Sequence, residues 1–139
     1  MKLLMATGNP GKVEELTALL APFGVELVCL KDLALPADCP ETGESFLENS
    51  KQKAFYYQRL SGLPVVADDS GLEVDALGGA PGIHSARFGG LETHMEKRRY
   101  LLDLLKSVEP EYRTARFCCA AVFFDGRTYL SAEATIEGF

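Results

Sequence analysis

Short apolar runs alternate with amphipathic stretches along the first half of the chain. Three of these runs are too short for helices and predict strands over Lys2–Ala6, Val25–Leu30 and Pro64–Ala67. Between the first two runs, apolar residues recur at helical spacing, at Val13, Leu16, Leu19 and Leu20. This spacing predicts a helix that ends at Phe23-Gly24, because glycine is a common residue just past a helix C-terminus.

A second helix is indicated further along. Residues 31–43 contain Pro36, Pro40 and Gly43, which favours a loop. Ser45 and Glu48 then have the spacing of a capping box, which predicts a helix from this point to about Leu60.

The second half of the chain has a different pattern. We expect a short strand over Leu72–Leu77, a helix over Glu92–Val108 and a central strand over Ala115–Phe124, which is apolar on both faces. The buried stripe of that helix is predicted to be Leu101, Leu102, Leu104 and Leu105. Asp125-Gly126 predicts a hairpin turn, and Thr128–Ile136 then alternates, with Leu130, Ala132, Ala134 and Ile136 facing inward. The order of elements predicts an α/β fold with a mixed sheet, in one domain over residues 1–139.

Composition limits the classes of function. Of the 139 residues, 47% are hydrophobic and 24% are charged, with a net charge of -6. An acidic chain is unsuited to long nucleic-acid duplexes, which require a broad basic surface, so no nucleic-acid partner is expected. The longest apolar run is too short to cross a membrane, and the glycines after Ala6 interrupt any secretory signal. We therefore expect a cytoplasmic protein with no membrane partner.

The loop after the first strand is a candidate phosphate site. It consists of Thr7, Gly8, Asn9, Pro10, Gly11 and Lys12. Its glycines allow close approach of the backbone, and the helix start and the lysine both favour an anion. It is not a Walker A loop, because its glycines are too close together and no serine or threonine follows the lysine. The alternative is a plain strand–helix turn with an exposed lysine.

Acidic residues supply candidate metal ligands. Asp68-Asp69 ends the predicted third strand, at the sheet edge where ligands of α/β proteins collect. Their side chains diverge, so one aspartate could bind Mg²⁺ and the other support the structure. The alternative is a capped turn, since Asp-Ser-Gly is common turn chemistry. Glu41, Glu44 and Glu48 could add a carboxylate, although solvent exposure and helix capping are favoured for Glu44 and Glu48.

One face of the second predicted helix carries Asn49 and Lys53, four residues apart. An amide and a lysine close to carboxylates suit a metal-bound triphosphate. The alternative is an ordinary solvated pair.

Together these segments resemble the inosine/xanthosine triphosphate pyrophosphatases, also called Ham1-like. The resemblance rests on ATGNPGK at 6–12, ETGESFLENSKQKA at 41–54 and ADDSGLEVDALGGAPGIHSARFGG at 67–90. The resemblance covers essentially the whole chain. It implies a Mg²⁺-dependent hydrolase that converts inosine and xanthosine triphosphates to monophosphate and pyrophosphate. It also implies an elongated mixed sheet flanked by helices, two lobes with a central cleft, and a homodimer.

The resemblance also assigns roles by position. It implies that the loop of Thr7, Gly8, Asn9, Pro10, Gly11 and Lys12 holds the triphosphate, and that Lys53 contacts a phosphate. Glu41 and Asp69 match the metal ligands, and Asp69 matches the catalytic aspartate that activates water. Asp68 lies beside it as possible support, and Ser70 matches a substrate contact.

The resemblance departs at two places. Family members continue beyond the point that corresponds to Phe139, with motifs that close over the base, and we expect the base pocket to be incomplete in these 139 residues. Ser50 stands where alanine is usual, a change expected to be harmless. Three other interpretations stay open at this point: a form that binds nucleotides without turnover, a Maf-type nucleotide pyrophosphatase, and an acidic α/β domain with no nucleotide role.

Overall fold

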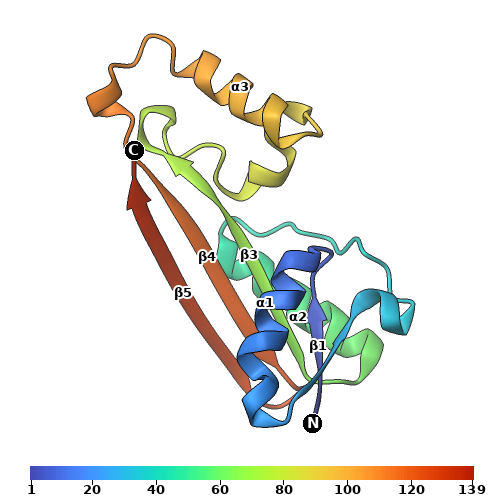
Figure 1. Cartoon of the computed structure of the whole chain (residues 1–139). Helices are drawn as coiled ribbons and strands as arrows, with labels where there is room; N and C mark the ends of the chain where they lie inside the picture. Colours follow the sequence, from blue (N-terminus) through green and yellow to red (C-terminus); the bar gives the residue numbers. More distant parts are fainter. The chain divides into compact units, whose positions relative to one another are not determined.

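The computed structural model describes all 139 residues and contains five strands and three α-helices (Figure 1). In chain order they are β1 (Lys2–Ala6), α1 (Pro10–Leu20), β2 (Glu26–Cys29), α2 (Phe46–Ser61), β3 (Val65–Val74), α3 (His94–Leu104), β4 (Ala115–Phe124) and β5 (Tyr129–Gly138). Short 3-10 turns connect several of them. The strand–helix alternation predicted for the first half of the chain is confirmed.

The five strands form one sheet in the order β2-β1-β3-β4-β5. β1 pairs in parallel with β2 from Lys2 to Met5 and with β3 from Leu4 to Ala6. β4 and β5 are joined by the predicted tight turn, in which the Asp125 carboxylate accepts hydrogen bonds from the Arg127 and Thr128 amides. A hairpin beside parallel strands makes the sheet mixed, as predicted.

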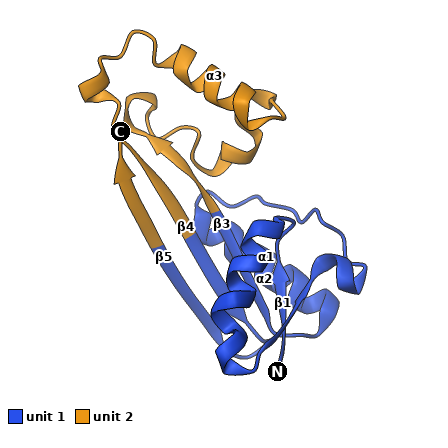
Figure 2. Ribbon diagram, viewed as in Figure 1, with its two compact units in different colours: residues 1–69, 120–133 blue, residues 70–119, 134–139 orange.

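The chain divides into two compact units (Figure 2). The first comprises Met1–Asp69 and Ala120–Glu133, and the second comprises Ser70–Cys119 and Ala134–Phe139. β3, β4 and β5 each contribute residues to both units. The single domain and the cleft between two lobes stay predictions.

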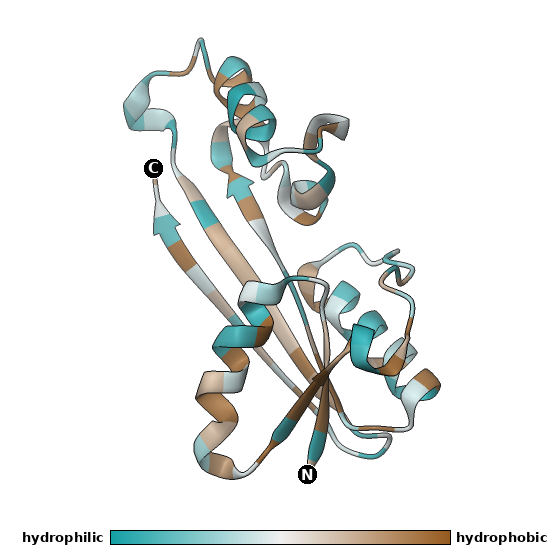
Figure 3. Ribbon diagram, turned by 45° about the vertical axis from the view of Figure 1, so that its right-hand side comes forward, coloured by the Kyte–Doolittle hydropathy of each residue, from teal (hydrophilic) through white to brown (hydrophobic).

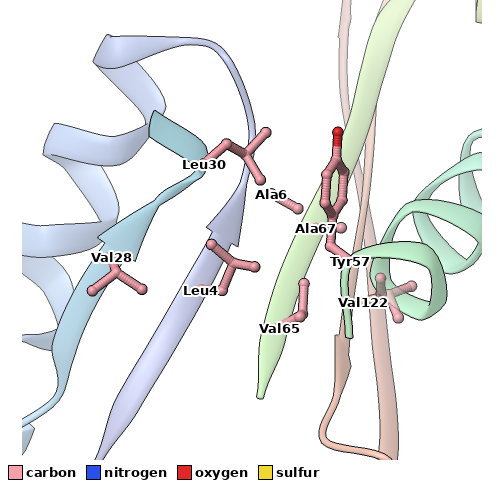
Figure 4. Close-up of a cluster of buried hydrophobic side chains, with 9 residues drawn as sticks. Leu4, Ala6, Val28, Leu30, Tyr57, Val65, Ala67 and Val122 are labelled. Carbon is pink, nitrogen blue, oxygen red and sulfur yellow. The ribbon is translucent and has the colours of Figure 1, made fainter. Parts of the chain in front are cut away.

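The core of the first unit lies between its strands and α2 (Figure 4). Leu4, Val65 and Val122 are completely or almost completely buried, and Ala54 and Tyr57 of α2 pack with them. The Tyr57 hydroxyl donates a hydrogen bond of 2.6 Å to the carbonyl of Pro36, so the phenol has a polar partner inside the core. This packing holds α2 against the strands that carry the candidate site.

Helix α2 begins close to the predicted position. The Ser45 hydroxyl accepts a hydrogen bond from the Glu48 amide, which is one half of a capping box. The Glu48 carboxylate instead accepts a hydrogen bond from the Glu44 amide at 2.7 Å. The helix ends at Ser61 and is capped by Gly62, whose φ of 69° is a left-handed conformation that glycine adopts without strain.

The prediction that the third strand ends before Asp68 is wrong. β3 continues through Asp68 and Asp69 to Val74, and residues 75–77 form a 3-10 turn instead of the end of a separate strand. Its pairing with β1 stops at Ala67, because β1 itself ends at Ala6. β3 continues beside β4 in the sheet, so turn-forming residues are held there in an extended conformation.

The leucine stripe predicted for the third helix is only half right. Leu105 is buried and Leu101 is partly buried, whereas Leu102 and Leu104 are exposed. Leu101 and Leu105 are four residues apart and share one face of the helix, whereas the other two leucines point away from it.

The inward-facing residues predicted for β5 are also wrong. Every residue of β5 is exposed, including Leu130 at 60% and Ile136 at 75%. β5 is the last strand of the sheet, and hydrophobic and hydrophilic residues alternate along its ribbon (Figure 3). The alternation is therefore real, but no element covers the apolar side chains.

None of the helices combines the length and the apolar character that crossing a membrane requires.

Candidate active site

The loop between β1 and α1 is shaped by its own side chains. Asn9 caps α1, and its carboxamide oxygen accepts a hydrogen bond from the Gly11 amide at 2.9 Å. The Thr7 hydroxyl accepts a hydrogen bond from the Asn9 amide at 3.2 Å. Residues 8–11 are exposed, and Pro10 occupies the first turn, where its missing N–H is not needed. The loop therefore presents an ordered helix N-terminus to solvent, as anion binding requires.

Lys12 and Asp68 connect this loop to β3. The lysine ammonium lies 2.5 Å from a carboxylate oxygen of Asp68, which is only 8% exposed. Partial burial of the pair strengthens their attraction relative to a pair in water. The contact places the Lys12 charge beside the strand that carries Asp69.

Lys53 connects three segments of the first unit. From α2, its ammonium donates a hydrogen bond of 2.8 Å to the backbone carbonyl of Asp68 and lies 3.1 Å from a carboxylate oxygen of Glu41. The Lys53 side chain is mostly buried. Lys53 thus joins the loop before α2 to β3, and it brings the second lysine to the same aspartate.

The side chains of Asp68 and Asp69 reach different partners. Asp68 contacts Lys12 near α1, whereas the Asp69 carboxylate accepts a hydrogen bond of 3.3 Å from the Asn49 amide of α2. Successive residues of a strand point to opposite faces, which explains the separation. The divergence predicted for this pair is confirmed, although it arises inside a strand and not at its end.

Burial raises the pKa of the Asp69 carboxyl above its usual value. The negative charges of Glu41 and Asp68 raise the pKa further, whereas Lys53 and the hydrogen bond from Asn49 lower it. A partly buried carboxylate with a raised pKa accepts a proton more readily than one in water. Such a group suits a general base.

The carboxylates present fit Mg²⁺ but not a metal that needs a complete cage of protein ligands. No group of three acidic, histidine or cysteine side chains is arranged to hold an ion. Glu41 and Asp69 nevertheless lie near enough for the charge of Glu41 to act on the pKa of Asp69. Mg²⁺ is commonly bound by one or two carboxylates, with water and substrate phosphates completing its shell.

The remaining candidates, Glu48 and Ser70, have other surroundings. Glu48 is engaged at the start of α2 through the Glu44 amide, in agreement with the capping interpretation. Ser70 directly follows Asp69 in β3, is partly buried and is the first residue of the second unit.

The contacts described above bring together, within the first unit, Lys12, Glu41, Lys53, Asp68 and Asp69.

A cavity of about 410 Å³ opens beside the loop. Thr7, Gly8, Asn9 and Pro10 line one part of it, and Val13, Leu30 and Leu35 contribute apolar side chains. No motif in the sequence predicts this cavity, because the loop is brought close to Leu30 and Leu35 only by the fold.

The contacts of two polar side chains of α2, Asn49 and Gln52, could not be predicted from the sequence. Helical spacing places Asn49 on one face with Lys53, but it does not predict the contacts of Asn49 with Gly43 and Asp69. Gln52 has no signal; its side chain binds both the amide and the hydroxyl of Thr42. Contacts of this kind depend on where a loop folds back, which spacing along a helix does not encode.

Curated relatives of high similarity are named as dITP/XTP pyrophosphatases. A protein of that name from Thermus thermophilus is 49% identical over 140 residues, which cover 99% of this chain and 67% of the relative. The one from Shigella flexneri is 49% identical over 123 residues, covering 88% of this chain and 62% of the relative. The chain therefore spans about two thirds of the length of these relatives.

Solved structures with a similar fold include Ham1 proteins. A HAM1 protein from Coxiella burnetii superposes with a TM-score of 0.90 at 31% identity, over 99% of this chain and 72% of that one. A nucleoside-triphosphatase, dITP/XTP pyrophosphatase, from Mycobacterium abscessus gives a TM-score of 0.84 at 38% identity, with coverage of 99% and 72%. The Ham1 family matches residues 3–139, which include every residue of the site described above. The chain belongs to the Ham1 family.

Proposed function

We propose that this chain hydrolyses inosine and xanthosine triphosphates, including dITP, to the monophosphate and pyrophosphate, with Mg²⁺. The observation that carries the proposal is the meeting of Lys12 and Lys53 at Asp68, next to the partly buried carboxylate of Asp69. Two cations beside a candidate base provide both charge for a triphosphate and a group that can activate water.

In this proposal the loop and the lysines bind the phosphates. The exposed helix start at residues 8–11 receives phosphate oxygens, and Lys12 and Lys53 stabilise the charge that develops on the departing pyrophosphate. Asp68 supports both lysines, through its carboxylate for Lys12 and its backbone carbonyl for Lys53. The apolar walls of the neighbouring cavity suit the flat ring of a nucleobase.

Asp69 acts on the water molecule. Its carboxylate takes a proton from water as the water oxygen forms a bond to the α-phosphorus, and the bond from that phosphorus to the bridging oxygen breaks, which releases pyrophosphate. When bound by Glu41 and Asp69, Mg²⁺ supplies charge neutralisation on the phosphate oxygens. The raised pKa of Asp69 supports its role as the base.

Two further expectations belong to this proposal. The protein acts in the cytoplasm, where it clears non-standard purine nucleotides, and it acts as a homodimer. The exposed edge strand β5, with apolar side chains on one face, supports pairing with a second copy.

The direct test is pyrophosphate release from ITP, XTP, dITP and GTP, with and without Mg²⁺. We expect Mg²⁺-dependent release that favours ITP, dITP and XTP over GTP. A folded chain that binds Mg-nucleotide but releases no pyrophosphate would instead support the binding-only function.

Asp69→Asn tests the base. It is expected to lower kcat by at least about 10²-fold, because a positioned general base contributes that much or more, while the fold is retained. Asp103→Asn, an identical change at an exposed position of α3, is the matched control. Near-normal turnover by Asp69→Asn, with circular dichroism unchanged, would remove Asp69 from the mechanism.

A further inference from the structure

The buried side chain of Asn49 accepts one hydrogen bond and donates another, to partners in two different segments. The residue is 2% exposed and lies in the first turn of α2. Its carboxamide oxygen accepts a hydrogen bond of 2.8 Å from the Gly43 amide, and its carboxamide nitrogen donates one of 3.3 Å to Asp69. A single side chain thus connects the loop before α2 to the proposed base.

The orientation of this side chain follows from the partners. A backbone amide can only donate, so the carboxamide oxygen must face Gly43. The carboxamide nitrogen then necessarily faces Asp69, where it donates to a carboxylate oxygen. The contact therefore favours one orientation of the Asp69 carboxylate, with an oxygen held toward α2.

Gly43 allows this arrangement because it has no side chain. A Cβ atom at Gly43 would lie 2.7 Å from the carboxamide oxygen of Asn49 and 2.7 Å from the Cβ of Glu48. Glycine is required here for close approach of the loop to α2, since any side chain would displace the Asn49 amide. Gly43 is two residues from Glu41, so the same contact limits where Glu41 can lie.

We propose that Asn49 is a positioning residue that sets the placement of Glu41 relative to Asp69. The proposal rests on the proposed function, in which these two carboxylates hold Mg²⁺. Asn49 acts on the position of both carboxylates, directly on Asp69 and through the Gly43 amide on the loop that carries Glu41. Hydrogen-bonding partners behind metal ligands commonly have this role.

The same helix offers a control for the attachment of the loop. The Gln52 side chain binds the amide of Thr42 at 2.9 Å and its hydroxyl at 3.2 Å, and it makes no hydrogen bond to Asp69. Gln52→Leu therefore loosens the loop from α2 but preserves the link between Asn49 and Asp69. Asn49→Leu, which has a similar size and no polar group, removes both hydrogen bonds of Asn49.

Steady-state kinetics and metal binding separate the two attachments. We expect Asn49→Leu to lower kcat about 10- to 100-fold and to raise the Mg²⁺ concentration for half-maximal rate, with a smaller change in KM for ITP. Mn²⁺ affinity, measured by electron paramagnetic resonance with nucleotide present, should weaken by about tenfold or more. Gln52→Leu frees Thr42 beside Glu41 but leaves the hydrogen bond between Asn49 and Asp69 in place, so it should change each of these values less than Asn49→Leu does. Equal effects of the two variants, or a loss of kcat without any change in metal affinity, would overturn the proposal.

A reciprocal exchange tests the link itself without any activity. Asn49→Asp sets two carboxylates against each other and should lower the midpoint of urea unfolding, measured without metal. Adding Asp69→Asn restores an amide opposite a carboxylate and should recover the midpoint. Additive effects of the two substitutions would show that the residues are not coupled and would refute the proposal. Because this assay needs no turnover, a chain that releases no pyrophosphate refutes the proposed function separately.

Discussion

Three buried polar side chains of α2 each bind the backbone of another segment. Tyr57 donates to the Pro36 carbonyl, Ser50 donates to the Ala120 carbonyl at 2.7 Å, and Asn49 accepts from the Gly43 amide. Each bond satisfies a buried group that would otherwise cost free energy. At the scale of single residues, these contacts determine which loop or strand lies against α2.

Tyr57 gives a prediction for alkaline pH. Burial raises the pKa of its hydroxyl to about 12, and the nearby acidic and thiol groups act in the same direction. The folded state holds this proton more tightly than the unfolded state, so the stabilisation is complete below the ordinary pKa of the phenol and is lost as pH rises toward 12. Between these two pH values, the free energy of unfolding should therefore fall.

Tyr57→Phe checks this sign. The variant should be less stable at neutral pH by about 1 kcal/mol, the usual net value of one hydrogen bond. Its loss of stability above pH 10, measured by urea unfolding at a series of pH values, should be shallower than that of the unaltered chain. An identical pH dependence of the two proteins would contradict the assignment.

At the scale of elements, α2 carries both the core and the candidate site. Ser50, Ala54 and Tyr57 face the strands, whereas Asn49 and Lys53 reach the aspartates of β3. Movement of α2 against the sheet would therefore displace site residues as well as core residues. Stability and activity are expected to be linked through this helix.

Ser50→Ala tests the attachment of α2 to β4. The Ser50 hydroxyl is completely buried and bonds the Ala120 carbonyl, so its removal should lower the free energy of unfolding by about 1 kcal/mol. Thermal or urea unfolding measures the change. An unaltered or increased stability would show that the β4 carbonyl finds another partner, and that the hydroxyl contributes nothing.

The sequence predicted the elements of the first half well, because their signals are local. The apolar run of β1, the helical spacing after Pro10 and the cap at Ser45 each act within a few residues. The continuation of β3 through Asp68 and Asp69 was missed because it depends on a neighbouring strand that lies about fifty residues later. Burial on β5 was overpredicted because alternation shows which residues share a face but not whether that face is covered.

The candidate site was predictable in its members but not in its contacts. Resemblance to a family placed Lys12, Lys53 and Asp69 in one site, and the structure brings these residues together. The use of Asp68 as a common partner of both lysines was not predictable, because it joins a carboxylate to one lysine and a backbone carbonyl to the other. Such three-dimensional contacts have no fixed spacing in the sequence.

At the scale of the whole molecule, β5 is the surface that supports the proposed homodimer. The strand ends the sheet and exposes apolar side chains, among them Leu130. Edge strands of this kind pair with further strands unless charges or bulges prevent it. The proposed homodimer would cover these side chains.

Leu130→Lys tests that interface. Sedimentation velocity of the unaltered chain at micromolar concentrations should show a dimer, and the variant should shift toward monomer because a charge is costly to bury. Ser131→Lys places the same charge on the opposite face of β5 and should leave the dimer largely intact. A monomer at every concentration of the unaltered chain would exclude the dimer.

The position of both aspartates inside one continuous strand has a consequence for how this protein can change over evolution. Along β3, the face on which a side chain lies depends only on whether its position is odd or even. Deleting or inserting one residue among Val65, Val66 and Ala67 would move Asp68 and Asp69 to the opposite faces of the sheet. Asp68, which binds Lys12, would then lie on the face of Asn49. Length variation is thus tolerable in the loops on either side of β3. Between the core and the aspartates, only insertions or deletions of two residues would keep each aspartate on its own face of the sheet.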